Sequence, residues 1–131
     1  RVAEAVRKAR PDAQVSAAVF SNWSSARDSV AQDWVLWAQK RYVDFVCPMN
    51  YHEDAEAQKG DVRRQLAWLR GTGVEVYPGI GVSTARLDAI EVIRQINVTR
   101  AGSTGGFVLF ELNRREAQDV LPALAPALGR K

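Results

Sequence analysis

The sequence predicts an α/β fold built from four strand–helix units with parallel strands. Apolar, strand-like runs begin near residues 15, 44, 74 and 106, so they recur at a period of about 30 residues. Amphipathic helical patterns fill the intervals, and this alternation is typical of βα repeats around a parallel sheet. Two of the runs also share a local pattern one period apart, Val46-Cys47-Pro48 and Val76-Tyr77-Pro78.

Each predicted strand is a short apolar run that gives way to polar or turn-forming residues. The strands are expected at residues 15–20, 44–51, 74–80 and 106–112. The second has the sharpest boundary, because its apolar residues change abruptly into Asn50, Tyr51 and His52. In parallel α/β sheets the carboxyl ends of the strands line one rim, where ligands bind.

The helices are predicted from apolar side chains at helical spacing. They are expected over residues 2–9, from about 24 to 41, from 61 to 70, from 84 to 101 and in the last fifteen residues, with a surface loop over 52–60. Side-chain caps are expected at Ser24 or Ser25, at Asp61, and at Ser83 or Thr84. The buried stripes are expected at Val30, Trp34 and Trp37, at Val62, Leu66 and Leu69, and at Leu87, Ile90, Ile93 and Ile96.

Two architectures fit four such units. One is a small doubly wound α/β domain, which usually has a fifth strand. The other is the C-terminal half of a (β/α)₈ TIM barrel, because a whole barrel needs about 250 residues and this chain has 131. The chain opens at Arg1 inside a helical pattern and without an initiator methionine, which favours residues 1–131 as a single fragment of a longer protein.

Composition excludes several classes of function. Apolar residues make up 47% of the chain and charged residues 25%, and no apolar run approaches the roughly 20 residues of a membrane span. The net charge of +3 is scattered and lacks the dense basic face with stacking aromatics that nucleic-acid binding requires. Cys47 and His52 are the only cysteine and histidine, so we predict no intrachain disulfide, no Ser-His-Asp triad, no metal and no cofactor.

Five residues at predicted strand ends are candidates for binding or chemistry. Asn22 and Trp23 follow the first strand, Asn50 and Tyr51 the second, and Glu111 the fourth. An aromatic ring at this rim can stack on a sugar face, and neutral polar groups suit an uncharged polyol better than an ion. Glu111 would point into the mouth of the sheet if residues 107, 109 and 111 share one face, and it could there assist proton transfer. Capping, packing and solvent exposure are the structural alternatives for all five.

Gly79 and Gly81 predict a tight turn that allows close packing. A phosphate-binding loop is the alternative, but the run lacks the last glycine of G-x-G-x-x-G, since position 84 is Thr, and it lacks a nearby lysine.

Several strings together resemble the glycosyl-hydrolase-like TIM-barrel family of bacterial envelope and secreted proteins. They are residues 15–20 (VSAAVF), 25–34 (SARDSVAQDW), 44–51 (DFVCPMNY), 76–81 (VYPGIG) and 106–110 (GFVLF), and the match spans nearly the whole chain. The resemblance implies strands five to eight of a barrel that binds or hydrolyses a polysaccharide or bacterial glycan outside the cytoplasm. The family's acidic motif at the end of strand four would lie before Arg1, so the resemblance places the main catalytic carboxylate in the missing half.

The resemblance carries over to Asn50, Tyr51 and Trp23, whereas Glu111 stands where a less acidic residue is expected. The fragment alone is expected to be inactive. It is also expected to expose sheet edges through which two copies could form a homodimer. A non-enzymatic α/β ligand-binding domain is the alternative function.

Overall fold

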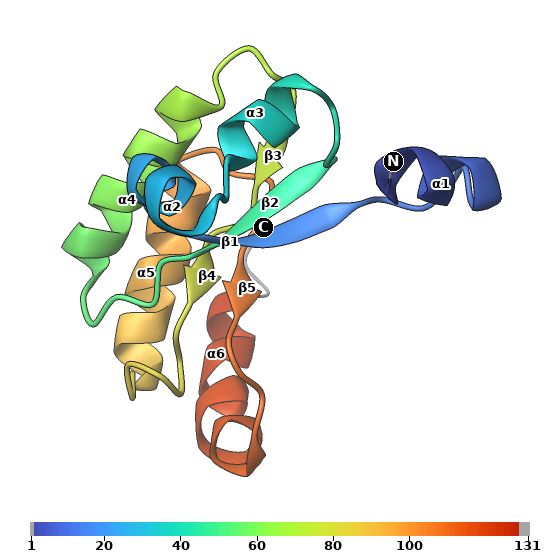
Figure 1. Cartoon of the computed structure of the whole chain (residues 1–131). Coiled ribbons are helices and arrows are strands. Elements are labelled where there is room, and N and C mark those ends of the chain that lie inside the picture. Colours follow the sequence, from blue (N-terminus) through green and yellow to red (C-terminus); the bar gives the residue numbers. More distant parts are fainter. Residues whose placement is uncertain (1, 129–131) are drawn as a thin grey trace.

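The computed structural model describes residues 2–128 and has an α/β fold with parallel strands, as predicted (Figure 1). In chain order the elements are α1 (Val2–Ala9), β1 (Ser16–Phe20), α2 (Trp23–Val30), α3 (Trp34–Gln39), β2 (Phe45–Met49), α4 (Ala55–Trp68), β3 (Glu75–Val76), β4 (Gly79–Ile80), α5 (Ala89–Ala101), β5 (Val108–Leu109), the π-helical turn η1 (Glu116–Val120) and α6 (Leu121–Leu128). Within these residues the sheet does not close into a barrel, and a small α/β domain is consistent with the arrangement.

All the strands are parallel, and their order in space follows their order in the chain. One sheet has the order β1-β2-β3, and β4 pairs with β5. The predicted third strand is divided into β3 and β4 at Pro78, which has no N–H to donate. Its first half bonds to β2, with the Tyr77 N–H donating to the Val46 carbonyl (2.8 Å), and the Pro78 carbonyl accepts from the Val108 N–H on the other side (3.1 Å). The four predicted strand positions are therefore confirmed, although β5 is shorter than residues 106–112.

The prediction of one continuous helix over residues 24–41 is wrong. This segment is divided into α2 and α3 at Ala31, whose φ of 57° is left-handed and ends α2. The side chain of Asn22, rather than that of Ser24 or Ser25, caps α2, and Asp33 caps α3. The break separates the two predicted core residues, so that Val30 at the end of α2 is 50% exposed while Trp34 at the start of α3 is fully buried.

Two further helix boundaries also differ from the prediction. Residues 52–60 are not a loop throughout, because Asp54 caps α4 and the helix begins at Ala55. In the same way Asp88 caps α5, which moves its start beyond Ser83 and Thr84. The predicted stripe is shifted with it, so that Ile90 is 63% exposed while Val92 and Ile96 are buried.

The core lies between one face of the sheet and the helices. Val19, Val46 and Val76 pack with α3 and the end of α4, whereas Ile80 packs with α5 and α6. Figure 1 shows α2–α5 gathered on one side of the strands, with α1 standing apart at the beginning of β1. Strand alternation sends the intervening residues, among them Ala18 and Phe20, to the other face, where both are exposed.

Candidate functional site

A buried polar layer lies beneath the carboxyl ends of β1 and β2. The fully buried Gln65 of α4 donates through Nε2 to the Ser21 carbonyl (3.1 Å) and to Asn50 Oδ1 (2.6 Å). Asn50 Nδ2 in turn donates to Gln65 Oε1 (3.4 Å), and Asn50 is itself 6% exposed. The Asn50 side chain thus fixes the end of β2 to α4, and its side-chain amide faces the protein interior.

The same layer continues to the loop after β2. Asp61 is 5% exposed, lies 2.8 Å from His52 Nε2 and is also paired with Arg64. The buried Gln95 of α5 donates to the His52 carbonyl (3.0 Å), so both α4 and α5 hold this loop. Asp61 orients an imidazole that remains partly exposed at the rim, with 28% of its side chain accessible.

Tyr51 stands above this layer on the uncovered face of the sheet. Its φ of 41° lies in the left-handed region, which is uncommon for a bulky residue and stores strain. Its ring stacks on Phe110, with ring centroids 5.2 Å apart and an interplanar angle of 15°. Burial raises the pKa of the Tyr51 phenol above its ordinary value, with a smaller contribution from the nearby Cys47.

Two glycines make room for Tyr51. A Cβ atom on Gly79 would lie 3.0 Å from the ring, and one on Gly81 would lie 2.8 Å from Tyr51 Cβ. The predicted close packing is therefore confirmed, although Gly79 belongs to strand β4 and the turn lies further along, at residues 82–86. The glycines allow one strand end to lie against the next.

Asn22 and Trp23 are engaged in local structure. The exposed Asn22 accepts from the Ser25 N–H (3.1 Å) as the cap of α2. Trp23 Nε1 donates to Asp33 (2.8 Å), and the ring packs edge-on against Trp68 with a centroid distance of 5.8 Å. Trp23 is thereby held against the helices that cover the sheet. Sugar binding by Asn22 or Trp23 stays a prediction.

The face that was predicted to carry Glu111 into the mouth of the sheet is the one turned toward the helices. Phe107 and Leu109 pack toward the helices, so Phe110 is the residue that reaches the uncovered face. Glu111 is exposed and lies beside a hollow of about 220 Å³ between β5 and the C-terminal helices, which the buried Glu116 also lines. Its backbone N–H donates to Ser83 Oγ (3.2 Å). A catalytic role for Glu111 stays a prediction.

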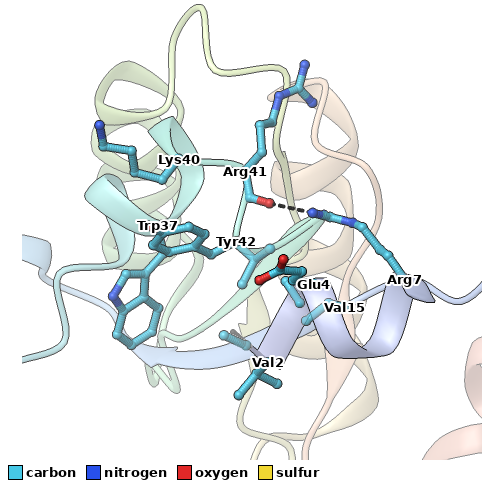
Figure 2. A pocket seen from close by; sticks show the side chains of 11 residues that line it. Val2, Glu4, Arg7, Val15, Trp37, Lys40, Arg41 and Tyr42 are labelled. Carbon is cyan, nitrogen blue, oxygen red and sulfur yellow. Dashed lines mark hydrogen bonds between the residues drawn. The ribbon is translucent and has the colours of Figure 1, made fainter. Parts of the chain in front are cut away.

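A large hollow lies at the opposite rim, and none of the predicted site residues lines it. It measures about 800 Å³ and lies between α1 and the turn after α3, with Trp37 and Tyr42 in its wall (Figure 2). Arg7 crosses from α1 and donates to the Arg41 carbonyl (2.9 Å). At the carboxyl rim, by contrast, the hollow beside Asn22 holds only about 230 Å³.

Arg7 also reaches Asp44, which joins α1 to the start of both β1 and β2. Its Nη2 lies 2.9 Å from Asp44 Oδ1, and Asp44 Oδ2 accepts from the Val15 N–H (2.7 Å). The Val15 N–H, followed by Arg7, holds the pKa of the Asp44 carboxyl below its ordinary value. The first residue of the predicted second strand is therefore a structural clamp at the rim opposite Tyr51.

The sequence reasoning missed the buried glutamine layer. Gln58, Asp61 and Gln65 occur at i, i+3 and i+7, which is the spacing of one helix face. The prediction used apolar periodicity alone and so started the helix at Asp61. The polar i, i+3, i+7 pattern directly after a strand end was the available signal.

Comparison with known proteins leaves the family open: no family model matches the chain, and no curated protein is significantly similar to it. Between residues 2 and 128 no helix is long and apolar enough to span a membrane. In the same range no group of three or more His, Cys, Asp or Glu side chains is placed to hold a metal ion. The class that the fold and rim define is an α/β protein with a parallel sheet and an aromatic pair at its carboxyl rim.

Proposed function

We propose that the chain is the C-terminal half of a (β/α)₈ barrel and that it binds a polysaccharide or bacterial glycan at the carboxyl rim of its sheet. The full-length protein would be a glycoside hydrolase-like domain, and its main catalytic carboxylate would lie in the other half. The observation that carries the proposal is the stacked Tyr51–Phe110 pair at that rim.

The barrel half is supported by the topology. The strands follow one another in space without the reversal of order that creates the switch point of a doubly wound sheet. The helices that follow β1, β2 and β4 pack on the same face of the sheet, as do the helices of a barrel. The opposite face then corresponds to the barrel interior, and its carboxyl end to the mouth.

Carbohydrate is supported as the ligand by the chemistry of this mouth. Phe110 is 40% exposed and Phe20 is 50% exposed, so aromatic faces are accessible at two strand ends. Sugars offer an apolar face edged by hydroxyl groups, and the tyrosine phenol can both donate to and accept from such groups. The strained backbone of Tyr51 also fits a binding role, because strain is concentrated where function holds a side chain in place.

The roles of the other candidates follow from their contacts. Asn50 supports the site from within by fixing the strand that carries Tyr51, and the Glu111 carboxylate accepts hydrogen bonds from sugar hydroxyl groups beside Phe110. Because the reactive carboxylate is assigned to the other half, this chain binds glycan without hydrolysing it. An extracytoplasmic location belongs to the same proposal and comes from the family resemblance.

Calorimetric titration with soluble hexasaccharides, among them cellohexaose and chitohexaose, tests the proposal. Replacing Tyr51 or Phe110 by alanine is expected to weaken binding roughly five- to tenfold, which corresponds to about 1 kcal/mol for a lost aromatic contact. Tyr42→Ala is the matched control, because Tyr42 is 52% exposed at the opposite rim. The proposal would be contradicted if the Tyr51 and Phe110 variants bound glycan as the wild type does while Tyr42→Ala lost binding. The absence of binding to any glycan would also contradict it.

A further inference from the structure

One face of the sheet is largely apolar and uncovered. The side chains on it are Ser16, Ala18, Phe20, Phe45, Cys47, Met49, Glu75, Tyr77, Val108 and Phe110. Ser16 and Glu75, the first residues of β1 and β3, are its polar members, and four of the apolar side chains are exposed, including Val108 at 38% and Phe110 at 40%. Parallel sheets normally have both faces covered, because βα crossovers and neighbouring elements bury them. Here the described helices that pack on the sheet do so on the other face (Figure 1).

Both outer strands also have an edge that no other strand covers. In the described part of the chain β1 pairs only with β2, and β5 pairs only with β4. At the carboxyl end of β1 the Phe20 N–H already donates to Gln32 Oε1 (2.9 Å), so the uncovered edge of β1 comprises the residues before Phe20. Proteins usually protect free edges with charged residues, prolines or bulges. Residues 16–20 of β1 are Ser-Ala-Ala-Val-Phe and residues 106–110 around β5 are Gly-Phe-Val-Leu-Phe, so neither edge carries a charge or a proline.

The two edges complement each other in a second copy of the chain. A two-fold axis parallel to the strands would bring β5 of one copy beside β1 of the other, twice, with every strand still parallel. Four strand positions from each copy make eight, the number at which side chains just fill a closed barrel. The small Ala18 on β1 would then face the bulky Val108 of β5, and Phe110 just beyond its end, across the junction.

We infer that this 131-residue chain forms a two-fold symmetric homodimer in which β1 of each copy pairs with β5 of the other and the two apolar faces form a shared interior. The inference rests on the proposed barrel half. The inference states what covers the uncovered face of the sheet when this chain is not joined to the other half of the barrel.

Light scattering after size-exclusion chromatography tests the inference. The wild-type chain is expected at twice its 14.5 kDa mass. Ala18→Lys and Val108→Lys place a charge in the shared interior and are expected to give folded monomers. Ile90→Lys is the matched control, because Ile90 is 63% exposed on α5, away from this face, and it should stay dimeric. A wild-type monomer at all concentrations, or folded lysine variants that remain dimeric, would overturn the inference.

Cys47 gives a second measurement that needs no variant. Its thiol is on the uncovered face and partly accessible in the single chain. Alkylation by iodoacetamide is therefore expected to slow at least tenfold as the protein concentration rises through the dissociation constant of the dimer. A rate independent of concentration would count against the dimer. A monomer that still binds glycan through Tyr51 would refute the dimer alone, whereas a dimer without glycan binding would refute the function alone.

Discussion

Replacing Gln65 by methionine tests whether the buried polar layer holds the carboxyl rim. Methionine is close to glutamine in volume, so the change removes hydrogen bonds with little change in packing. Gln65 donates to Ser21 and Asn50, and it is the only side-chain partner of the buried Asn50 amide among the described residues. Each lost bond costs about 1 kcal/mol and each orphaned buried group about 1–3 kcal/mol, so we expect a loss of about 2–4 kcal/mol.

The assay is urea unfolding at one fixed protein concentration, because association would itself change the apparent stability. With a slope of about 2 kcal/mol per molar urea, the midpoint should fall by roughly 1–2 M. Asn50→Leu should cost a similar amount for the same reason. The loss in free energy of unfolding should be smaller in the double variant than the sum of the two single losses, by more than about 1 kcal/mol. When both partners are replaced by apolar groups, fewer buried polar groups are left without a hydrogen bond. Strictly additive losses, or a Gln65→Met loss below about 0.5 kcal/mol, would refute the coupling on which the rim depends.

Two other variants test the supports of the sheet. Gly81→Ala puts a Cβ 2.8 Å from Tyr51 Cβ and even closer to Thr84 Oγ1, so it should destabilise the chain by about 1–3 kcal/mol in urea unfolding. Wild-type stability would be the contrary result. Asp44 has a pKa lowered in the folded state, so its stabilisation is present above its ordinary pKa and is lost as the pH falls toward the lowered value. Asp44→Asn, which removes the charge facing Arg7, should flatten this acid side of the stability profile, and an unchanged profile would refute the clamp.

The positions of the strands could be predicted because each is a short apolar run bounded by turn residues. The prediction for residues 44–51 places β2 (Phe45–Met49) within two residues at each end. Helix boundaries were harder, since a single left-handed residue, Ala31, divides a pattern whose apolar spacing is otherwise continuous. Nothing in the spacing of Val30, Trp34 and Trp37 marks that break.

The site was only partly predictable for a related reason. Asn50 and Tyr51 were identified from the end of a strand, yet their neighbours Gln65 and Phe110 come from elements 15 and about 60 residues further along the chain. The direction of Glu111 could not be predicted, because alternation shows that residues 107, 109 and 111 share a face but does not show that this face is turned toward the helices. Single-sequence periodicity describes one element at a time, whereas the rim is made by contacts between elements.

The most direct test of glycan binding at the carboxyl rim is a ¹⁵N-resolved NMR titration of the 131-residue chain with the hexasaccharide that binds best. The proposal predicts that the largest shifts occur at the amides of residues 50–52 and 110–111, with smaller ones near Phe20. Shifts centred on Trp37 and Tyr42, in the hollow beside α1, would contradict it, and so would a spectrum that no glycan changes.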